Sequence, residues 1–429
     1  MTNHADPSRR TFLAQTAAVV GAGAVLPTIA TAGSMRRKSP GKDEQIRIGI
    51  IGPGGMGTAH CTSILTLVNN GHEDVQIVAL ADVCDSRSEH AAGVCQELQG
   101  STPDIYRDHR ELLARDDIHG VLIASPEHWH SRHAIAAIQG GKDVYLEKPM
   151  TLNLADAMDL RKVVSANPGV VFQVGTQKIM LPKFREAKKM LDADMIGHPT
   201  FSQTSYCRNN PDGEWNYYHI DESWEPGKNI DWKTWCEPVG QIDWDPKVYA
   251  RWRRYKAWST GIIGDLLVHE ITPLIMALDR AGWPTRVQAT GGHFLDKAME
   301  NHDQVNINVS FENDHTMIVA GSTCNEVGFE TLIRGQKGNM YLNGRHCVMR
   351  PERAFVDEID EVTVECPDIG NDQDQLRLNW FRCMRSREKP DSNVDLGTKV
   401  MVVVDLATRS MWTGKTYDFD HKTMTARAV

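Results

Sequence analysis

The sequence lacks several features that would assign it to a familiar class of protein. Its nine cysteines include no C-x-x-C pair, which argues against a zinc site and against a disulfide scaffold, and we expect no bound metal. It has no basic tract and its net charge is −9 at pH 7, so we expect no nucleic-acid partner. No repeat, low-complexity segment or apolar run of membrane-spanning length follows the N-terminus. These absences leave a globular protein of ordinary composition, long enough for two domains.

The first 32 residues have the organisation of an export signal. Arg9 and Arg10 form a twin-arginine pair, residues 13–30 are moderately apolar, and residues 30–32 read A-T-A, an A-x-A cleavage signature. A retained or disordered N-terminal anchor is the alternative. We predict residues 1–32 to be a twin-arginine signal peptide, so that the translocation machinery exports a folded protein to the periplasm. The polar, basic residues 33–44 are the expected linker.

Repeating β–α units predict a Rossmann domain over residues 45–178. Continuous apolar runs such as QIRIGIIG are typical of buried parallel strands, and segments of good helix formers separate them. Such units form a doubly wound parallel sheet. The strands expected are 45–52, 75–82, 120–126, 142–149 and 170–175, and the helices expected are 57–68, 86–99, 131–141 and 154–166.

The pattern changes after residue 178, and we expect a second α/β domain over residues 179–429. An aromatic, loop-rich stretch precedes longer strands in which apolar and polar residues alternate, which is typical of an antiparallel or mixed sheet. The helices at the end of the chain could pack back on the first domain. The strands expected are 305–312, 315–322 and 329–335, and the helices expected are 182–193, 374–387 and 395–413.

The motif GPGGMG lies between the first strand and the first helix and has the form G-x-G-x-x-G. Gly52 permits a tight turn, Gly54 lets the backbone approach a pyrophosphate, and Gly57 lets the helix pack closely on the strand. Gly55 and Met56 lie at the start of the expected helix and are cofactor-binding candidates too. A helix N-terminus offers N–H donors and partial positive charge to phosphates. We predict a dinucleotide cofactor here; a glycine-rich turn without a ligand is the alternative.

An acidic residue, Asp82, ends the second strand. Its carboxylate would accept hydrogen bonds from a ribose diol and repel a 2′-phosphate, which favours NAD over NADP. Arg87 lies nearby and could accommodate that phosphate, so NADP stays open as the cofactor.

Two further motifs carry residues suited to chemistry. LEKPM puts Glu147 and Lys148 at the carboxyl end of a Rossmann strand, and GIIGDLLVH puts Asp265 and His269 four residues apart, on one face of a helix. Together with SPEHWHSRH, VGTQ, DWKTW and the tail NWFRCMRSREKP, they resemble the Gfo/Idh/MocA family of oxidoreductases, named after glucose–fructose oxidoreductase and inositol dehydrogenase. The resemblance spans almost the whole chain after the signal.

The resemblance implies a Rossmann domain followed by an α/β domain with a large open, mostly antiparallel sheet, which is a common face for homo-oligomers in this family. The substrate, usually a sugar or polyol, would lie between that sheet and the nicotinamide. The catalytic lysine, aspartate and histidine of the family fall on Lys148, Asp265 and His269. One departure is Thr260, where the family often has glycine.

These residue types suit the oxidation of a secondary alcohol. His269 could take the hydroxyl proton near neutral pH. Lys148 could stabilise the developing alkoxide, and Asp265 could orient the imidazole or bind a sugar hydroxyl. In the alternative reading Lys148 is a surface lysine, and Asp265 and His269 only decorate a helix.

Further cofactor-binding candidates come from position and from the resemblance. Ser125, Pro126 and His130 follow a strand at the carboxyl end of the sheet, and we expect them beside the nicotinamide ribose; ordinary loop packing is the alternative. The set is completed by Glu147, Lys148 and Gln177, from the EKP and VGTQ motifs.

Seven tryptophans lie between residues 206 and 258. Aromatic faces stack well on sugar rings, and we take Trp235 and Trp258, with Arg208, as substrate-binding candidates. A domain interface or an oligomer contact is the alternative. The tryptophans are Trp215, Trp224, Trp232, Trp235, Trp244, Trp252 and Trp258.

We therefore predict an exported NAD(P)-dependent oxidoreductase that transfers hydride between a sugar or polyol hydroxyl and a tightly held nicotinamide. Export suggests that the cofactor is loaded before translocation and regenerated in place, since little free nicotinamide is expected outside the cytoplasm. Two alternatives stay open. One is redox-neutral cleavage of a glycoside through a transient keto-sugar, and the other is a non-catalytic sugar- or nucleotide-binding regulator.

Overall fold

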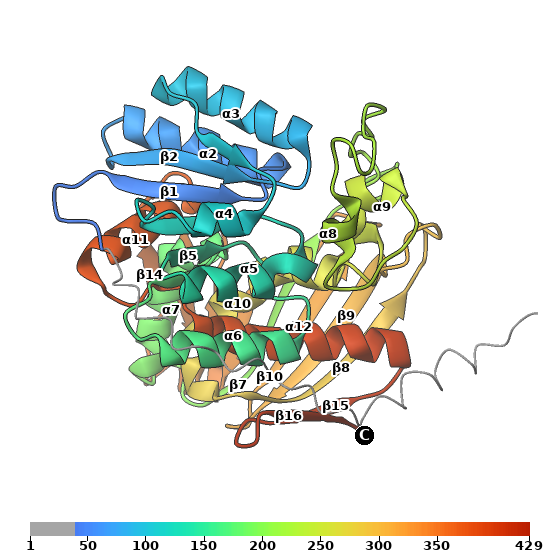
Figure 1. The fold of residues 1–429 in the computed structure, drawn as a ribbon. Coiled ribbons are helices and arrows are strands. Elements are labelled where there is room, and N and C mark those ends of the chain that lie inside the picture. Colours follow the sequence, from blue (N-terminus) through green and yellow to red (C-terminus); the bar gives the residue numbers. More distant parts are fainter. Residues whose placement is uncertain (1–38) are drawn as a thin grey trace, which may run out of the picture. The chain divides into compact units, whose positions relative to one another are not determined.

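The computed structural model describes residues 39–429. The predicted signal peptide lies outside the described residues. Within the described part, two sheets organise the chain (Figure 1).

The first sheet has six parallel strands in the order β3-β2-β1-β4-β5-β6, which is the order of a dinucleotide-binding Rossmann domain. The predicted doubly wound sheet is thus confirmed. The strand β3 was not anticipated, because it has only three residues and two of them are exposed. The strands are β1 (Ile46–Ile51), β2 (Val75–Ala81), β3 (Asp104–Tyr106), β4 (Gly120–Ile123), β5 (Asp143–Leu146) and β6 (Phe172–Val174). The connecting helices are α2 (Gly55–Asn69), α3 (Asp85–Gln99), α4 (His109–Leu113), α5 (Glu127–Gln139) and α6 (Leu154–Ala166).

The second sheet has ten strands in the order β14-β13-β12-β11-β7-β10-β9-β8-β15-β16. The strands β7 and β10 run parallel, and every other neighbouring pair of described strands is antiparallel. The expected mostly antiparallel sheet is therefore confirmed. Its strands are β7 (Pro199–Cys207), β8 (Pro284–Gly292), β9 (Gln304–Phe311), β10 (Thr316–Ser322), β11 (Leu332–Gly335), β12 (Gly338–Tyr341), β13 (His346–Pro351), β14 (Val362–Glu365), β15 (Tyr417–Asp420) and β16 (Thr425–Ala428).

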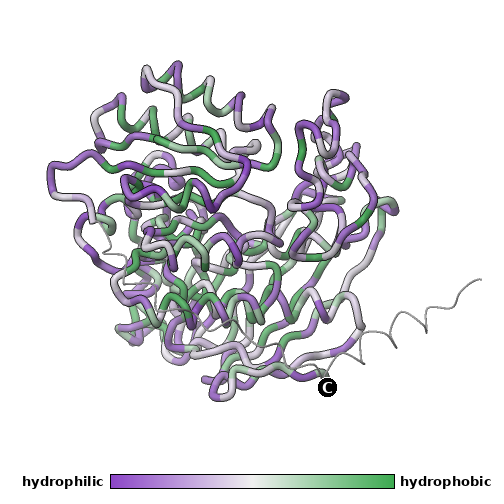
Figure 2. The backbone as a smooth tube through the Cα atoms, viewed as in Figure 1, coloured by the Kyte–Doolittle hydropathy of each residue, from purple (hydrophilic) through white to green (hydrophobic). Residues whose placement is uncertain are grey.

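Helices cover one face of this second sheet. In β9 the apolar residues Val305, Ile307 and Val309 are buried while Asn306 and Asn308 are exposed, so one face packs against helices and the other is polar. In Figure 1, α12 crosses the sheet beside β8 with α6 next to it, and the apolar residues of these layers are green in Figure 2. The remaining helices are α7 (Pro182–Asp192), α8 (Trp232–Cys236), α9 (Pro246–Ala250), α10 (Val268–Ala277), α11 (Asp372–Ser386) and α12 (Val394–Thr413).

The helix α11 packs against the first sheet although it lies near the end of the chain. Its Trp380 is fully buried and contacts the ring of Tyr145 on β5, with ring centroids 5.7 Å apart. Just after the helix, Arg387 pairs with the buried Asp143 at 2.6 Å. Residues more than 200 positions away in the sequence thus pack against the Rossmann sheet and help to bury it.

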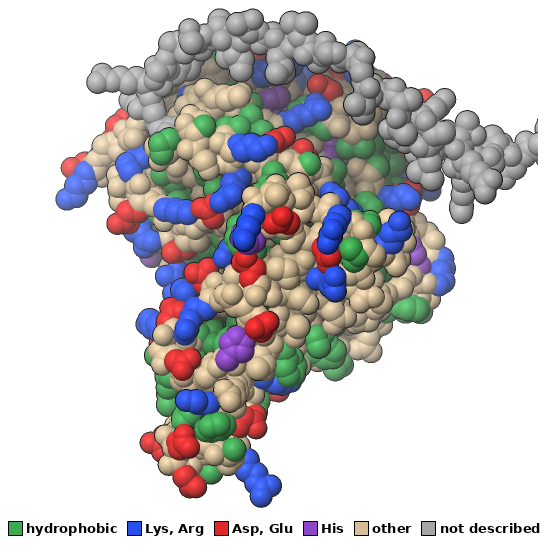
Figure 3. All heavy atoms as spheres, turned by 90° about the horizontal axis from the view of Figure 1, so that it is seen from below, with side chains coloured by type: hydrophobic (Ala, Val, Ile, Leu, Met, Phe, Trp, Pro, Cys, Tyr) green, Lys and Arg blue, Asp and Glu red, His purple; other side chains and the backbone are tan. Residues whose placement is uncertain are grey.

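The surface carries charges of both signs. On the face drawn in Figure 3, acidic and basic side chains are interspersed. Within residues 39–429 no helix has the combination of length and apolarity that a bilayer crossing requires. All nine cysteines are unpaired, and seven of them are buried.

We predict that Trp380→Ala lowers the free energy of unfolding by about 3–5 kcal/mol, because it leaves a large cavity between α11 and the sheet. Trp412→Ala, at a site on α12 that is 44% exposed, is the matched control and should cost less than about 1 kcal/mol. Urea unfolding followed by tryptophan fluorescence measures both. Equal losses for the two variants would show that α11 does not contribute to the core in this way.

Candidate functional site

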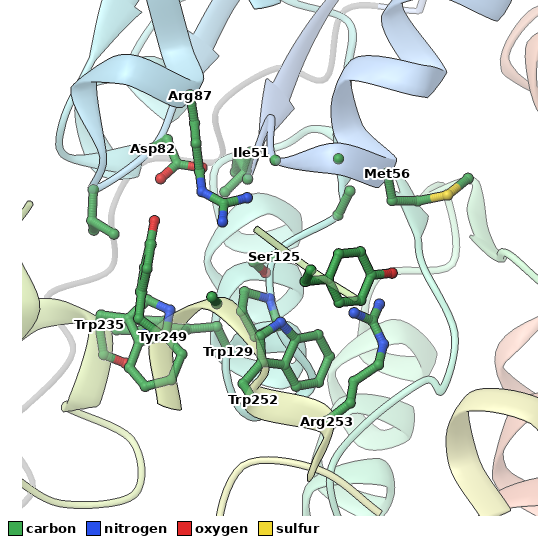
Figure 4. Close-up of a pocket in the computed structure, with 18 of the residues that line it drawn as sticks. Ile51, Met56, Asp82, Arg87, Ser125, Trp129, Trp235, Tyr249, Trp252 and Arg253 are labelled. Carbon is green, nitrogen blue, oxygen red and sulfur yellow. The ribbon is translucent and has the colours of Figure 1, made fainter. Parts of the chain in front are cut away.

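A cavity of about 490 Å³ lies at the carboxyl ends of β1, β2 and β4. Ligands of doubly wound sheets bind at this edge. The opposite wall comes from the second domain, chiefly from residues 208–258, which we call the bridging segment. Figure 4 shows Asp82, Arg87 and Met56 on the Rossmann side and Trp252 and Arg253 facing them.

The glycine motif forms a tight cradle at the mouth of β1. Gly52 has φ of 79°, and a Cβ there would come within 2.5 Å of the Ser125 amide nitrogen. A Cβ on Gly57 would come within 2.5 Å of the Gly52 carbonyl oxygen. Gly54, Gly55 and Met56 line the cavity, and α2 begins at Gly55. The residues present therefore fit a pyrophosphate on a helix N-terminus.

Asp82 and Arg87 lie together beyond this cradle. Asp82 Oδ1 accepts a hydrogen bond from the Cys84 amide at 2.9 Å, and burial raises the pKa of the Asp82 carboxyl to about 6, against the nearby charge of Arg87. The Arg87 guanidinium lies 5.1 Å from the ring centre of Tyr249 and 5.5 Å from that of Trp224. Its buried Nε has no hydrogen-bond partner within residues 39–429.

Lys148 meets Asp265 at the other end of the cavity. Lys148 Nζ donates to Asp265 Oδ1 at 2.8 Å and to the Asp265 carbonyl oxygen at 3.0 Å. Arg253 Nε donates to the same Oδ1 at 2.9 Å. Burial alone would raise the pKa of Asp265, but Arg253 and Lys148 outweigh burial and hold that pKa well below its usual range. The carboxylate thus remains ionised between two cations.

His269 is not paired with Asp265 in the way that its spacing suggested. Residues Ile263–Leu267 form a π-helix, and α10 begins only at Val268. No hydrogen bond joins Asp265 to His269 in the described structure. His269 is buried outside the cavity lining, and its Nδ1 has no partner among residues 39–429. Burial lowers the pKa of His269 to about 3, with a further contribution from Lys148.

The other cofactor candidates divide into two groups. Ser125 and Pro126 line the cavity, and Ser125 Oγ is 3.0 Å from His133 Nδ1. His130 does not reach the cavity, because both of its ring nitrogens lie 2.7 Å from carbonyl oxygens, those of Ser125 and Pro149. Its ring ties together two loops of the site. Gln177 also lies outside the lining.

Most of the tryptophans pack on one another rather than on the cavity. Trp232, Trp235 and Trp258 form a small core together with Tyr249, and the rings of Trp232 and Trp235 stack at 4.7 Å. Trp235 still lines the cavity, whereas Trp258 does not. Arg208 lines the cavity and donates to Glu214 Oε1 at 3.1 Å.

Two family models match the chain. Residues 46–176 match "Oxidoreductase family, NAD-binding Rossmann fold", and residues 241–419 match "Oxidoreductase family, C-terminal alpha/beta domain". The chain belongs to the Gfo/Idh/MocA oxidoreductase family. Its first domain is accordingly an NAD-binding Rossmann domain.

Individual relatives share this family but are distant. Inositol 2-dehydrogenase 3 of Saccharopolyspora erythraea is 30% identical over 155 residues, which is 36% of this chain and 43% of that protein. The scyllo-inositol 2-dehydrogenase (NAD(+)) of Bacillus subtilis is 30% identical over 159 residues, 37% of this chain and 44% of that protein. The matches thus span less than half the length of either relative.

Solved structures of the same fold match nearly the whole chain. Levoglucosan dehydrogenase in complex with NADH and L-sorbose superposes with a TM-score of 0.66 at 18% identity, covering 87% of this chain and 98% of that one. An oxidoreductase domain protein from Kribbella flavida gives the same TM-score, identity and coverage.

Much of the bridging segment lies between the two family matches and fastens onto the Rossmann domain. The Asp231 amide donates to the Val83 carbonyl at 2.8 Å, and the Asp85 amide donates to the Asn229 carbonyl at 3.0 Å. Arg107 reinforces the junction by donating to the Lys228 carbonyl at 2.7 Å. These bonds join the turn after Asp82 directly to the segment that forms the opposite wall.

A buried relay holds the loop that carries Lys148. Glu147 Oε1 is 2.8 Å from His60 Nε2 on α2, and Arg377 Nε on α11 donates to His60 Nδ1 at 2.9 Å. His60 therefore donates to Glu147 as a neutral ring. Burial alone would raise the pKa of Glu147, but the His60 hydrogen bond and the charge of Lys148 lower it to about 2. Glu147 lies outside the cavity lining, and its contacts are those of a positioning residue. No local motif marks His60 or Arg377.

A second buried carboxylate, Glu127, holds the chain before the π-helix. Glu127 accepts hydrogen bonds from Ser259 Oγ at 2.5 Å, the Thr260 amide at 3.0 Å and Thr260 Oγ1 at 2.9 Å. A Cβ on Gly264 would lie 1.9 Å from Thr260 Oγ1. Thr260, where the family often has glycine, thus has a hydrogen-bond acceptor in Glu127 on α5. Its hydroxyl also has room, because residue 264, one turn later, is glycine.

Glu127 gives a test by pH. Burial raises the pKa of Glu127 to about 7, against its hydrogen bonds, from an ordinary value of 4.5. The folded state therefore binds more protons than the unfolded state between these values, and stability falls as pH rises through that window. We predict that Glu127→Gln gains stability relative to the wild type across the window, by on the order of 3 kcal/mol.

Denaturant unfolding at several pH values measures this difference. Glu89→Gln, on the exposed face of α3, is the control and should show a constant difference from the wild type. A constant difference for Glu127→Gln as well would contradict the assignment of a proton to Glu127.

Proposed function

We propose that this protein is an NAD-dependent oxidoreductase acting on a secondary hydroxyl of a sugar or polyol. The observation that carries the proposal is Lys148, held by Asp265 at the wall of a cavity whose far side is the glycine cradle. The relatives named as inositol dehydrogenases, and the similar fold solved with NADH and L-sorbose, support a polyol or sugar as substrate.

The residues of the Rossmann side suit NAD. The cradle at Gly52–Gly57 would hold the pyrophosphate, and Asp82 would accept hydrogen bonds from the ribose diol. Bound NAD would supply the acceptor for a hydride. Asp82 favours NAD, while Arg87, which lines the same cavity, keeps NADP as the second candidate.

The chain's own residues would manage the proton and the developing charge. Lys148 uses two of its three N–H donors on Asp265, which leaves one for the substrate oxygen and for stabilising an alkoxide. Asp265 orients Lys148 through these two hydrogen bonds. His269 is neutral and does not line the cavity, so we propose that a proton reaches it through Lys148 rather than directly from the substrate.

The cofactor would be retained between turnovers. The bridging segment is bonded to the turn that follows Asp82, and we infer that these bonds slow the release of a dinucleotide bound along this edge. Retention suits an exported enzyme, because the cofactor would then travel with the folded chain. It is equally compatible with redox-neutral cleavage of a glycoside through a transient keto-sugar.

Two further expectations concern partners. We propose export through the twin-arginine machinery, on the basis of Arg9 and Arg10. We also propose a homo-oligomer formed through the exposed face of the second sheet, where Asn306 and Asn308 project from β9.

We predict that Lys148→Met lowers turnover by roughly 10²- to 10⁴-fold while the affinity for NAD is kept, because the donor to the substrate oxygen is lost but the cradle is intact. Lys162→Met, at an exposed pair on α6, is the control. Activity is followed by nicotinamide absorbance, and the NAD held by each purified variant is quantified after the protein is denatured. Undiminished turnover in Lys148→Met would remove Lys148 from the chemistry, and sugar binding without turnover in the wild type would favour a regulator.

Export has its own test. Replacing Arg9 and Arg10 together by lysine should keep the protein in the cytoplasm, because the paired arginines are the recognised feature of the signal. The adjacent arginines Arg36 and Arg37, replaced in the same way, provide the control and should leave export unchanged. Cell fractionation and immunoblotting measure the distribution. Periplasmic protein at the wild-type level in the Arg9/Arg10 variant would exclude this route.

A further inference from the structure

Arg253 contributes a guanidinium to the cavity that is only partly used by the protein. Its Nε donates to Asp265, and its charge lies 4.2 Å from the ring centre of Trp252. No hydrogen bond is made by its two terminal nitrogens within residues 39–429. The side chain is 21% exposed and lines the cavity, where Figure 4 shows its tip directed inward. Four N–H donors are therefore available to a ligand.

The charged groups around Arg253 are of both signs. Asp265 provides a single negative charge to two cations, Lys148 and Arg253. The other arginine at this end, Arg208, has its own partner in the buried Glu214. His269 is neutral, because burial lowers its pKa to about 3. Glu147 is ionised beside Lys148 and supplies a second negative charge. The charges of this cluster therefore balance, and the four unused donors of Arg253 are what mark it as a ligand-binding group.

We propose that Arg253 binds a carboxylate of the substrate, so that the enzyme acts on a sugar acid rather than on a neutral sugar. The planar fork of a guanidinium matches a carboxylate through two parallel hydrogen bonds. The four free N–H donors of Arg253 can hold both oxygens of such a carboxylate, and no protein carboxylate competes for them within residues 39–429. The proposal rests on the proposed function, since it names the substrate class of the same site.

The positions of Lys148 and Arg253 also bear on how the carboxylate of the substrate would lie relative to the hydroxyl that is oxidised. Lys148 and Arg253 share Asp265 Oδ1, at 2.8 and 2.9 Å, so their free donors lie on either side of one carboxylate. A substrate whose carboxylate meets Arg253 would bring a nearby ring hydroxyl to Lys148. Arg253 would thus select the substrate and orient it for hydride transfer.

Sugar pairs that differ only in the carboxylate test the proposal. Glucose and glucuronate, and galactose and galacturonate, are assayed with the NAD-loaded enzyme by nicotinamide absorbance. The wild type should favour the acid of at least one pair by about 10- to 100-fold in kcat/KM, the range expected for a charge-assisted hydrogen bond. Arg253→Gln should abolish that preference, and Arg253→Lys should keep part of it.

Arg251→Gln is the matched control. Arg251 is two residues away, is held by the Tyr218 carbonyl and Asn216 at the surface, and does not line the cavity, so the preference should be unchanged. Equal kcat/KM for acid and neutral sugar in the wild type would overturn the proposal even if Arg253→Gln did not fold. An equal loss for both sugars in Arg253→Gln, or a loss confined to NAD binding, would also overturn it. Reduction of NAD by neutral sugars alone would leave the proposed function intact, whereas no reduction by any sugar would contradict both.

Discussion

The site depends on a single buried carboxylate shared by two cations. Asp265 is 7% exposed and accepts hydrogen bonds from both Lys148 and Arg253. Lys148 lies 117 positions away and Arg253 only 12, so the ion cluster fixes the Rossmann loop after β5 against the second domain. Removing either cation would take a hydrogen-bond donor away from a buried carboxylate, which is costly. The electrostatics of substrate recognition follow from the same arrangement.

Buried hydrogen bonds around the Asp265 cluster hold the segments that carry its residues. The relay from Arg377 through His60 to Glu147 reaches the loop of Lys148 from behind. Glu127 anchors Thr260, so that the chain enters the π-helix at a fixed point. The bridging segment then pairs with the backbone after β2, at the end of the cavity beside Asp82. Each of these acidic side chains is buried with hydrogen-bond donors already supplied, as buried polar groups require.

Features set by local physics could be predicted from the sequence. Continuous apolar runs gave the strands β1, β2, β4 and β5, and GPGGMG marked the cradle because close backbone approach requires glycine at Gly52 and Gly57. The chain is helical through Asp265 and His269, but the π-helix at Ile263–Leu267 was not anticipated. The π-helix depends on how Thr260, Gly264 and Glu127 pack, and no periodicity in the sequence reports that packing. His60 and Arg377 were missed for a similar reason, because they meet across 317 positions. The sequence shows that the bridging segment is rich in aromatic residues, but not what their rings contact. The same rings could bind a sugar or form a small core, and most of them form the core.

The central claim is that a retained NAD and the Asp265 cluster together make a self-contained redox site. The most direct measurement is the nicotinamide content of the protein purified without added cofactor, followed by its absorbance when hexoses and hexuronates are added. The account predicts stoichiometric NAD, released only on unfolding, and the absorbance of reduced nicotinamide on adding a substrate. Protein that carries no nicotinamide and exchanges added NAD freely would contradict retention, and bound NAD that no sugar or sugar acid reduces would contradict the chemistry.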